Sequence, residues 1–161
     1  MSEAKPFAPI NDLGDFDVLE DWRWLVGKKA SARLLTAMGD IFFIKKRLLG
    51  SEQVYLLDVT LGDSRKIADS WEVFKERMAS PDNEVLLWYK YGLLDEVHAS
   101  IGQLSEGCCY SPKVIPLLGG SFDVDNFEQT PWQVHVSIHG RLYEQIKNLP
   151  EGTELSDLDI E

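Results

Sequence analysis

Two adjacent cysteines and two nearby histidines are the residues best suited to nucleophilic chemistry. Cys108 or Cys109 could act as a nucleophile if His135 or His139 activated the thiolate, as in a small hydrolase. The sequence places no base beside either cysteine, so this hydrolase is the less favoured hypothesis. Because neighbouring residues of a strand point to opposite faces, a disulfide between the two cysteines is not expected either.

Two clusters of residues could bind a metal ion, but each lacks something that a metal site requires. His135, Ser137 and His139 would share one face of a strand, but no third ligand is indicated beside the two imidazoles. A calcium loop around Asp123 and Glu128 departs from the twelve-residue pattern. His98 lies on an apolar helix face and is expected to be a hydrogen-bonded core histidine.

Catalytic motifs are otherwise missing from the sequence. The tetrad Ser2-Glu3-Ala4-Lys5 matches Ser-x-x-Lys, but it falls in an expected tail that could not hold it against a substrate. No phosphate loop, nucleophile elbow or His-Glu-x-x-His sequence occurs. The sequence therefore predicts a protein that is not an enzyme and has no cofactor or metal.

The net charge of the chain limits the kinds of molecule that it is expected to bind. The 161 residues carry a net charge of −11, distributed as +3 over residues 27–79 and −6 over residues 80–130. Such a field disfavours nucleic acid and anionic membranes and would steer a basic partner toward the acidic part; the alternative is that the acids serve solubility alone. Without a signal sequence or an 18-residue apolar run, we expect a soluble, cytoplasmic protein.

The elements are expected to form around an antiparallel meander over residues 32–68. Its apolar runs, separated by short Gly-containing turns, are too close together for parallel crossovers. They are Leu34–Met38, Ile41–Ile44 and Val54–Val59.

Helices are expected on either side of this meander. One spans Asp15–Val26, and three short ones after the meander cover one face of the sheet. These three begin at Trp71 after an Asp69 or Ser70 cap, run from Pro81 to Tyr91 with Gly92 as the stop, and span Leu93–Ile101.

The C-terminal third is expected to hold edge strands, then a strand and a helix. Loops and short edge strands are predicted over residues 106–131, a half-buried strand over Trp132–Ile138 and a helix over Arg141–Leu149. The fold class is α+β, with an antiparallel β-meander covered by several short helices. We expect a flexible lead-in over residues 1–14, with Phe7 or Ile10 against the body, one domain over 15–152 and an acidic tail over 153–161.

An ordered series of short motifs runs through residues 16–152. The motifs are Gly39-Asp40-Ile41-Phe42, Val54–Val59, Trp71–Phe74, Tyr110, Leu117–Gly120, Val124–Phe127, His135 with Ser137, and Gln145–Gly152. This series resembles a known family, the C-terminal domain of type VI secretion immunity proteins, whose namesake protects a bacterium from a DNase effector.

The resemblance implies a non-enzymatic protein that binds a toxin, here a nuclease with a basic surface, and covers its active site. Acids would steer the toxin and an exposed aromatic residue would anchor it. A regulatory or scaffold module without a toxin partner is the alternative. The predicted partner-binding residues are Asp82, Glu84, Tyr89, Asp95, Glu96, Glu106, Asp123, Asp125, Glu128 and Trp132.

Overall fold

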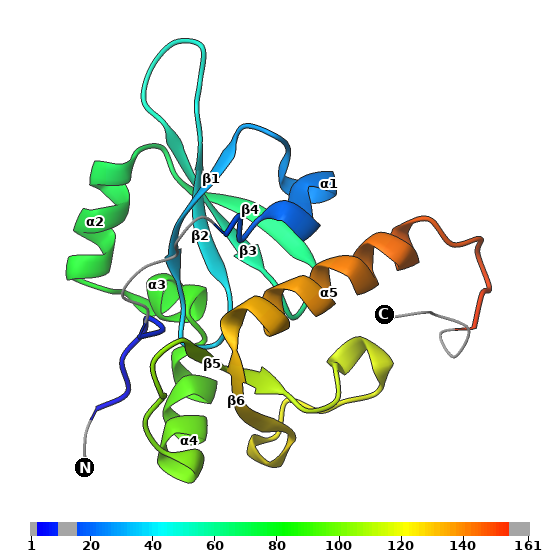
Figure 1. Cartoon of the computed structure of the whole chain (residues 1–161). Coiled ribbons are helices and arrows are strands. Elements are labelled where there is room, and N and C mark those ends of the chain that lie inside the picture. Colours follow the sequence, from blue (N-terminus) through cyan, green and yellow to red (C-terminus); the bar gives the residue numbers. More distant parts are fainter. Residues whose placement is uncertain (1–2, 10–15, 155–161) are drawn as a thin grey trace.

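A four-stranded antiparallel sheet forms the centre of the protein, whose computed structural model describes residues 3–9 and 16–154 (Figure 1). The strands pair in chain order, which confirms the predicted meander. They are β1 (Ala30–Leu35), β2 (Ile41–Lys45), β3 (Gln53–Asp58) and β4 (Asp63–Ala68).

The fourth strand was not among the predicted apolar runs. β4 is an edge strand that carries Arg65 and Lys66 on its exposed positions. Charged side chains protect an exposed sheet edge from pairing with other chains. The other strands are predicted from their apolar runs. β4 has no such run, so the sequence pattern does not predict it.

Both faces of the sheet are covered, because the apolar side chains of its central strands alternate between two cores. Phe42 points to one core with Phe74 and Trp88, whereas Ile41 and Phe43 point to the other. The first core lies under the helices that follow the meander. The second lies under the N-terminal and C-terminal helices.

Three helices cover the first face, as predicted: α2 (Trp71–Ala79), α3 (Asn83–Trp88) and α4 (Tyr91–Ile101). The Ser70 hydroxyl caps α2 by accepting a hydrogen bond from the Val73 amide. The predicted bounds of α3 are wrong at both ends. Asp82 caps it by accepting a hydrogen bond from the Val85 amide, and it ends at Trp88 rather than at Tyr91.

The predicted strand over Trp132–Ile138 is wrong. This segment begins the long helix α5 (Trp132–Lys147), and the strand before it is β6 (Phe127–Pro131), which pairs with β5 (Cys108–Pro112). The buried residues of α5 recur every three or four positions, whereas Val134 and Ile138 are exposed. Two residues of this buried stripe are histidines, which count as polar in a sequence pattern. The apolar residues alone therefore do not show the helical period. The remaining turns of this region are the 3-10 helices η2 (Pro116–Leu118) and η3 (Val124–Asn126).

The N-terminal helix is shorter than predicted and packs on α5. It consists of a 3-10 turn η1 (Glu20–Trp22) followed by α1 (Arg23–Val26). The Trp22 indole N–H donates to the Val136 carbonyl over 2.9 Å. Gly140 of α5 leaves room for this contact, because a Cβ there would lie 2.6 Å from the Asp21 carbonyl oxygen.

The lead-in packs on the body through Phe7, as predicted. Phe7 pairs with Thr36 in an isolated bridge and lies edge-on to Phe42 at 6.4 Å between ring centroids. Ile10 and most of the acidic tail lie outside the described residues. In the described part of the chain, no helix is long and apolar enough to cross a membrane.

Candidate functional site

An apolar groove lies where α3 meets α4. Its volume is about 610 Å³. Leu87 is 70% exposed on the α3 side, and the rings of Tyr91 and Phe122 are partly exposed beside it. The lining residues are Asn83, Leu86, Leu87, Lys90, Tyr91, Gly92, Leu93 and Phe122. Large apolar side chains gathered in an exposed hollow mark an interaction site.

The turn between the two helices explains why these side chains face outward. Val85 and Trp88 of α3 pack into the core, which leaves Leu87 on the opposite side of the helix. Lys90 then adopts a left-handed conformation with φ of 54°, which ends α3 and starts α4 at Tyr91. The predicted stop at Gly92 is therefore wrong, because the chain already turns at Lys90.

Lys90 holds this strained turn by reaching into the sheet. Its ammonium group lies 3.1 Å from a carboxylate oxygen of Asp40 and 3.1 Å from one of Asp58. Burial lowers the pKa of Lys90, but the two carboxylates outweigh burial and raise it. Burial raises the pKa of Asp40 to about 7 against the opposing effect of Lys90. The floor of the groove is thus fixed to β2 and β3 by a buried charge cluster.

Two buried histidines lie behind this cluster on α5. His135 Nε2 donates to the Gly39 carbonyl over 3.1 Å, so its Nδ1 accepts from the Ser111 hydroxyl over 2.7 Å. His139 Nδ1 donates to the His135 carbonyl over 2.7 Å. Burial lowers the pKa of both histidines, which keeps the rings neutral.

The metal hypothesis for these histidines gains no support. They lie one helical turn apart instead of on a strand face, and both nitrogens of His135 are bonded within the protein. Among the described residues, no group of three potential ligands could hold a metal ion. The two rings lie 4.5 Å apart at their centroids, and the ring of His135 packs against the turn at Gly39. A Cβ on Gly39, whose φ is +84°, would overlap the His135 ring.

Burial argues against a nucleophilic role for Cys109. Cys109 is fully buried, and burial raises the pKa of its thiol, which disfavours the thiolate. Cys108 is half-buried on the other face of β5, and both thiols are free. This arrangement agrees with the opposite orientations predicted from the sequence.

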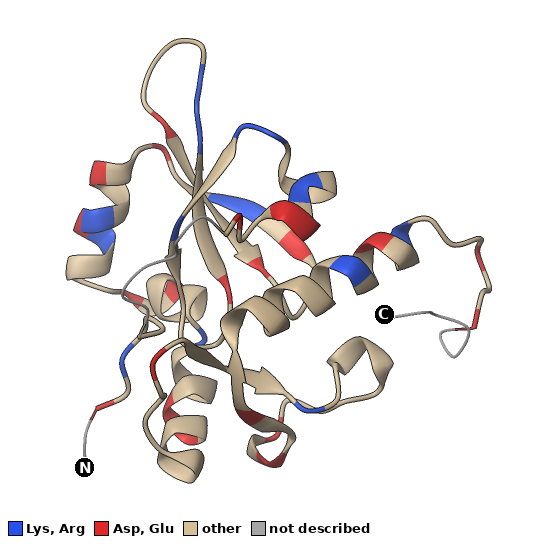
Figure 2. Ribbon diagram, in the orientation of Figure 1, with Lys and Arg blue, Asp and Glu red and all other residues tan. Residues whose placement is uncertain are grey.

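The eight predicted acids are all exposed, and none of them is among the residues that line the groove. Asp82 and Glu84 flank the lining residue Asn83, and both pair with Arg77, at 3.3 Å and 3.0 Å. Asp95 lies one turn along α4 from Tyr91. Asp123 follows the lining residue Phe122 and lines another hollow with Asp125. The remaining acids are Glu96, Glu106 and Glu128. Figure 2 shows acids on α3 and α4, and lysines and arginines on the stem of the β2–β3 hairpin and on β4, α1, α2 and α5.

The prediction that Tyr89 and Trp132 are exposed aromatics is wrong. Tyr89 is 7% exposed and Trp132 is 2% exposed. Trp132 begins α5, and its ring packs edge-on against Phe16, with 5.5 Å between the ring centroids. Tyr89 follows α3 on its core side. The aromatic rings available in the groove are those of Tyr91 and Phe122 instead.

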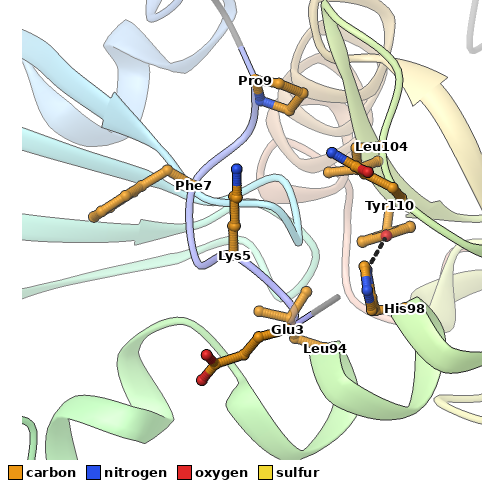
Figure 3. Close-up of a pocket in the computed structure, with 9 residues that line it drawn as sticks. Glu3, Lys5, Phe7, Pro9, Leu94, His98, Leu104 and Tyr110 are labelled. Atoms are coloured by element: carbon orange, nitrogen blue, oxygen red, sulfur yellow. Dashed lines mark hydrogen bonds between the residues drawn. The ribbon is translucent and has the colours of Figure 1, made fainter. Parts of the chain in front are cut away.

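A second, smaller cavity of about 160 Å³ lies between the lead-in and α4 (Figure 3). Tyr110 donates its hydroxyl proton to the Gly102 carbonyl, so its oxygen accepts from His98 Nδ1 over 3.2 Å. His98 is therefore hydrogen-bonded at the edge of the core, as predicted. Glu3 and Lys5 of the lead-in and Leu94 of α4 line the same cavity.

The comparisons with known proteins single out the part of the chain that contains the groove. Residues 68–143 match the family described as T6SS immunity protein Tdi1, C-terminal. This match confirms the resemblance predicted from the sequence. We refer to residues 68–143 as the Tdi1-like segment.

Comparisons over the whole chain give a similar solved structure but no curated protein. Among solved structures, the chain is similar to the crystal structure of Atu4351 from Agrobacterium tumefaciens, with 19% identity and a TM-score of 0.47. The similarity covers 70% of this chain and 54% of that chain, so this chain spans about half of that protein's length. No curated protein matches the chain.

The Tdi1-like segment contains every residue that lines the groove, whereas the carboxylates that hold Lys90 lie outside it, in the sheet. The sequence reasoning missed the groove itself. One feature of the sequence points to an exposed leucine: Leu87 and Trp88 are adjacent on a short helix, so they cannot both face the core. Nothing near Lys90 in the sequence predicts that this lysine is buried.

Proposed function

We propose that this chain is an immunity protein that binds and neutralises a cognate toxin of a type VI secretion system and acts without catalysis. One observation carries the proposal: the segment that matches the Tdi1 family contains the whole exposed apolar groove. Immunity requires a surface that can bind another protein tightly. A groove with apolar walls and charged edges has that character.

The toxin proposed is a nuclease with a basic active-site surface. A nuclease must attract phosphate, so its catalytic face carries lysines or arginines. The acids around the groove, among them Asp82, Asp95 and Asp123, would attract that face and speed association. Leu87 and Tyr91 would provide the buried contacts that slow dissociation. Bound in this way, the protein covers the active site.

The proposed place of action is the cytoplasm of the toxin-producing bacterium and of its sister cells. The acidic protein would compete there with nucleic acid for the toxin. Nucleic acid and membranes are not among its proposed partners.

Co-expression with the toxin gene tests this proposal. The toxins to test are effectors encoded next to the gene for this chain, each produced from an inducible promoter in a heterologous bacterium. We expect the wild-type chain to restore colony counts at least about a hundredfold, and Leu87→Asp to lose most of that protection. Leu61→Asp, at an exposed turn position that does not line the groove, is the control and should protect fully. Death of the cells despite soluble wild-type protein would favour a regulatory module instead.

A further inference from the structure

The hairpin between β2 and β3 carries an exposed apolar tip on a basic stem. Leu48 is 97% exposed and Leu49 is 84% exposed, and they follow Lys46 and Arg47 directly. We call residues 46–49 the finger. Its tip extends from the body of the protein at the end opposite α4 (Figure 1).

The finger has a uniform charge. Residues 45–51 include three cations and no acid, and the nearest acid along the chain, Glu52, lies 3.7 Å from Arg33 in an ion pair. Exposing two adjacent leucine side chains to water is unfavourable in free energy, so an arrangement of this kind often marks a surface that a partner covers. The partner should offer an apolar hollow with negative edges.

The groove in the Tdi1-like segment has these complementary properties. Its walls are mainly leucine and aromatic side chains. Asp82 and Glu84, on either side of the lining residue Asn83, share one cation, Arg77, at 3.3 Å and 3.0 Å, which leaves this edge with a net negative charge. Asp123 follows the lining residue Phe122. The cation in its lining, Lys90, directs its ammonium group to Asp40 and Asp58. A basic segment with two leucines would therefore bury its apolar tip and place its cations beside acids.

We infer that the finger of one copy occupies the groove of a second copy. The finger and α4 lie at opposite ends of the molecule (Figures 1 and 2), so a chain cannot fill its own groove. The contact is head-to-tail and joins two different surfaces, so it leaves a free finger and a free groove at the ends of each assembly. A contact made by one hairpin tip is small, and we expect reversible association in the micromolar to millimolar range.

This association would regulate the groove. If the proposed function is right, a toxin that binds the same groove more tightly displaces the finger, so self-association shields the apolar surface until the toxin arrives. The self-association itself can be measured on the chain alone. Its failure would leave the proposed immunity function untouched.

Sedimentation velocity over a concentration series, about 10 µM to about 1 mM, tests the inference. We expect the wild type to grow from monomer to dimer and larger species as concentration rises, and to shift back toward monomer at about 0.5 M salt, where exposed charges are screened. Leu48→Ser/Leu49→Ser and Leu87→Asp should each stay monomeric. Leu61→Ser should associate like the wild type.

Mixing the two interface variants gives the sharpest result. The finger variant retains an intact groove, and Leu87→Asp retains an intact finger, so an equimolar mixture should form a one-to-one dimer that grows no further. A wild type that is monomeric throughout would overturn the inference. So would finger variants that still dimerise by themselves.

Discussion

The ammonium group of Lys90 lies 3.1 Å from the Asp40 carboxylate, across the space between the α3–α4 turn and the start of β2. Asp40 is fully buried, and its other carboxylate oxygen accepts a hydrogen bond from the Val59 amide over 3.0 Å. Because Lys90 also lines the groove, this ion pair connects the candidate binding surface to the sheet.

Removing the charge of Lys90 should destabilise the protein strongly. Lys90→Met leaves the Asp40 carboxylate buried without its cation, and loss of one partner of a buried pair costs about 3–5 kcal/mol. Lys66→Met is the control, since Lys66 pairs with Asp69 at the surface, and it should change the free energy of unfolding by less than about 1 kcal/mol. Urea unfolding measures both. Equal stability of the two variants would contradict this role for Lys90.

The stability of the protein should fall between pH 6 and pH 5. Burial lowers the pKa of His135 well below 6.5 and also lowers the pKa of His139, so below about pH 6 the unfolded chain takes up protons on both rings more readily than the folded chain. Asp40 opposes this: its pKa is raised from 3.8 to about 7, so the folded chain keeps a proton there that the unfolded chain loses. Two histidines oppose one carboxyl group, so the free energy of unfolding should fall by at most about 1 kcal/mol per pH unit.

Replacement of one histidine tests that balance. His139→Gln removes one of the two rings that take up protons on unfolding, so the stability of this variant to urea should depend less on pH between 5 and 6 than that of the wild type. A wild type that becomes more stable as the pH falls over this range would contradict the assignment of neutral buried histidines.

Gly140 should be intolerant of a methyl group although it lies within a helix. A Cβ there would lie 2.6 Å from the Asp21 carbonyl oxygen, so Gly140→Ala must push η1 away from α5, at a cost of about 1–3 kcal/mol. Gly92→Ala in α4 is the matched control, because no atom lies within 4 Å of its added Cβ. Helix propensity alone favours alanine at both sites. Thermal melts should therefore shift in opposite directions.

The two cysteines should differ in reactivity toward a thiol reagent such as a disulfide dye. Cys108 is half-buried, whereas Cys109 is buried and its pKa is raised, so native protein should react at one thiol and urea-unfolded protein at two. Cys108→Ser should abolish the reaction of the native protein. Rapid labelling of Cys109 in the native state would contradict the buried position.

Local chemistry accounts for the elements that could be predicted from the sequence. Ser70 lies directly before the first turn of α2 and caps it, and Gly102 ends α4 as expected. The alternation of Ile41, Phe42 and Phe43 between two cores follows from the period of a strand. Such signals lie within a few residues of the element they define.

Long-range contacts account for the errors. The first half of α5 is mispredicted as a strand because its histidines count as polar in the sequence pattern, although Ser111 and Gly39, far away in sequence, satisfy the ring of His135 inside the core. The end of α3 was misplaced because Lys90 turns toward Asp40, fifty residues earlier in the chain. The groove depends on that turn, so its position could not be read from sequence spacing.

The most direct test of toxin binding is calorimetric titration of the purified chain with a catalytically inactive form of the proposed toxin. We predict a one-to-one complex whose affinity falls at least about a hundredfold in Leu87→Asp and changes less than about threefold in Leu61→Asp. Equal loss of affinity in both variants, or none in either, would contradict the assignment of the groove as the toxin-binding surface.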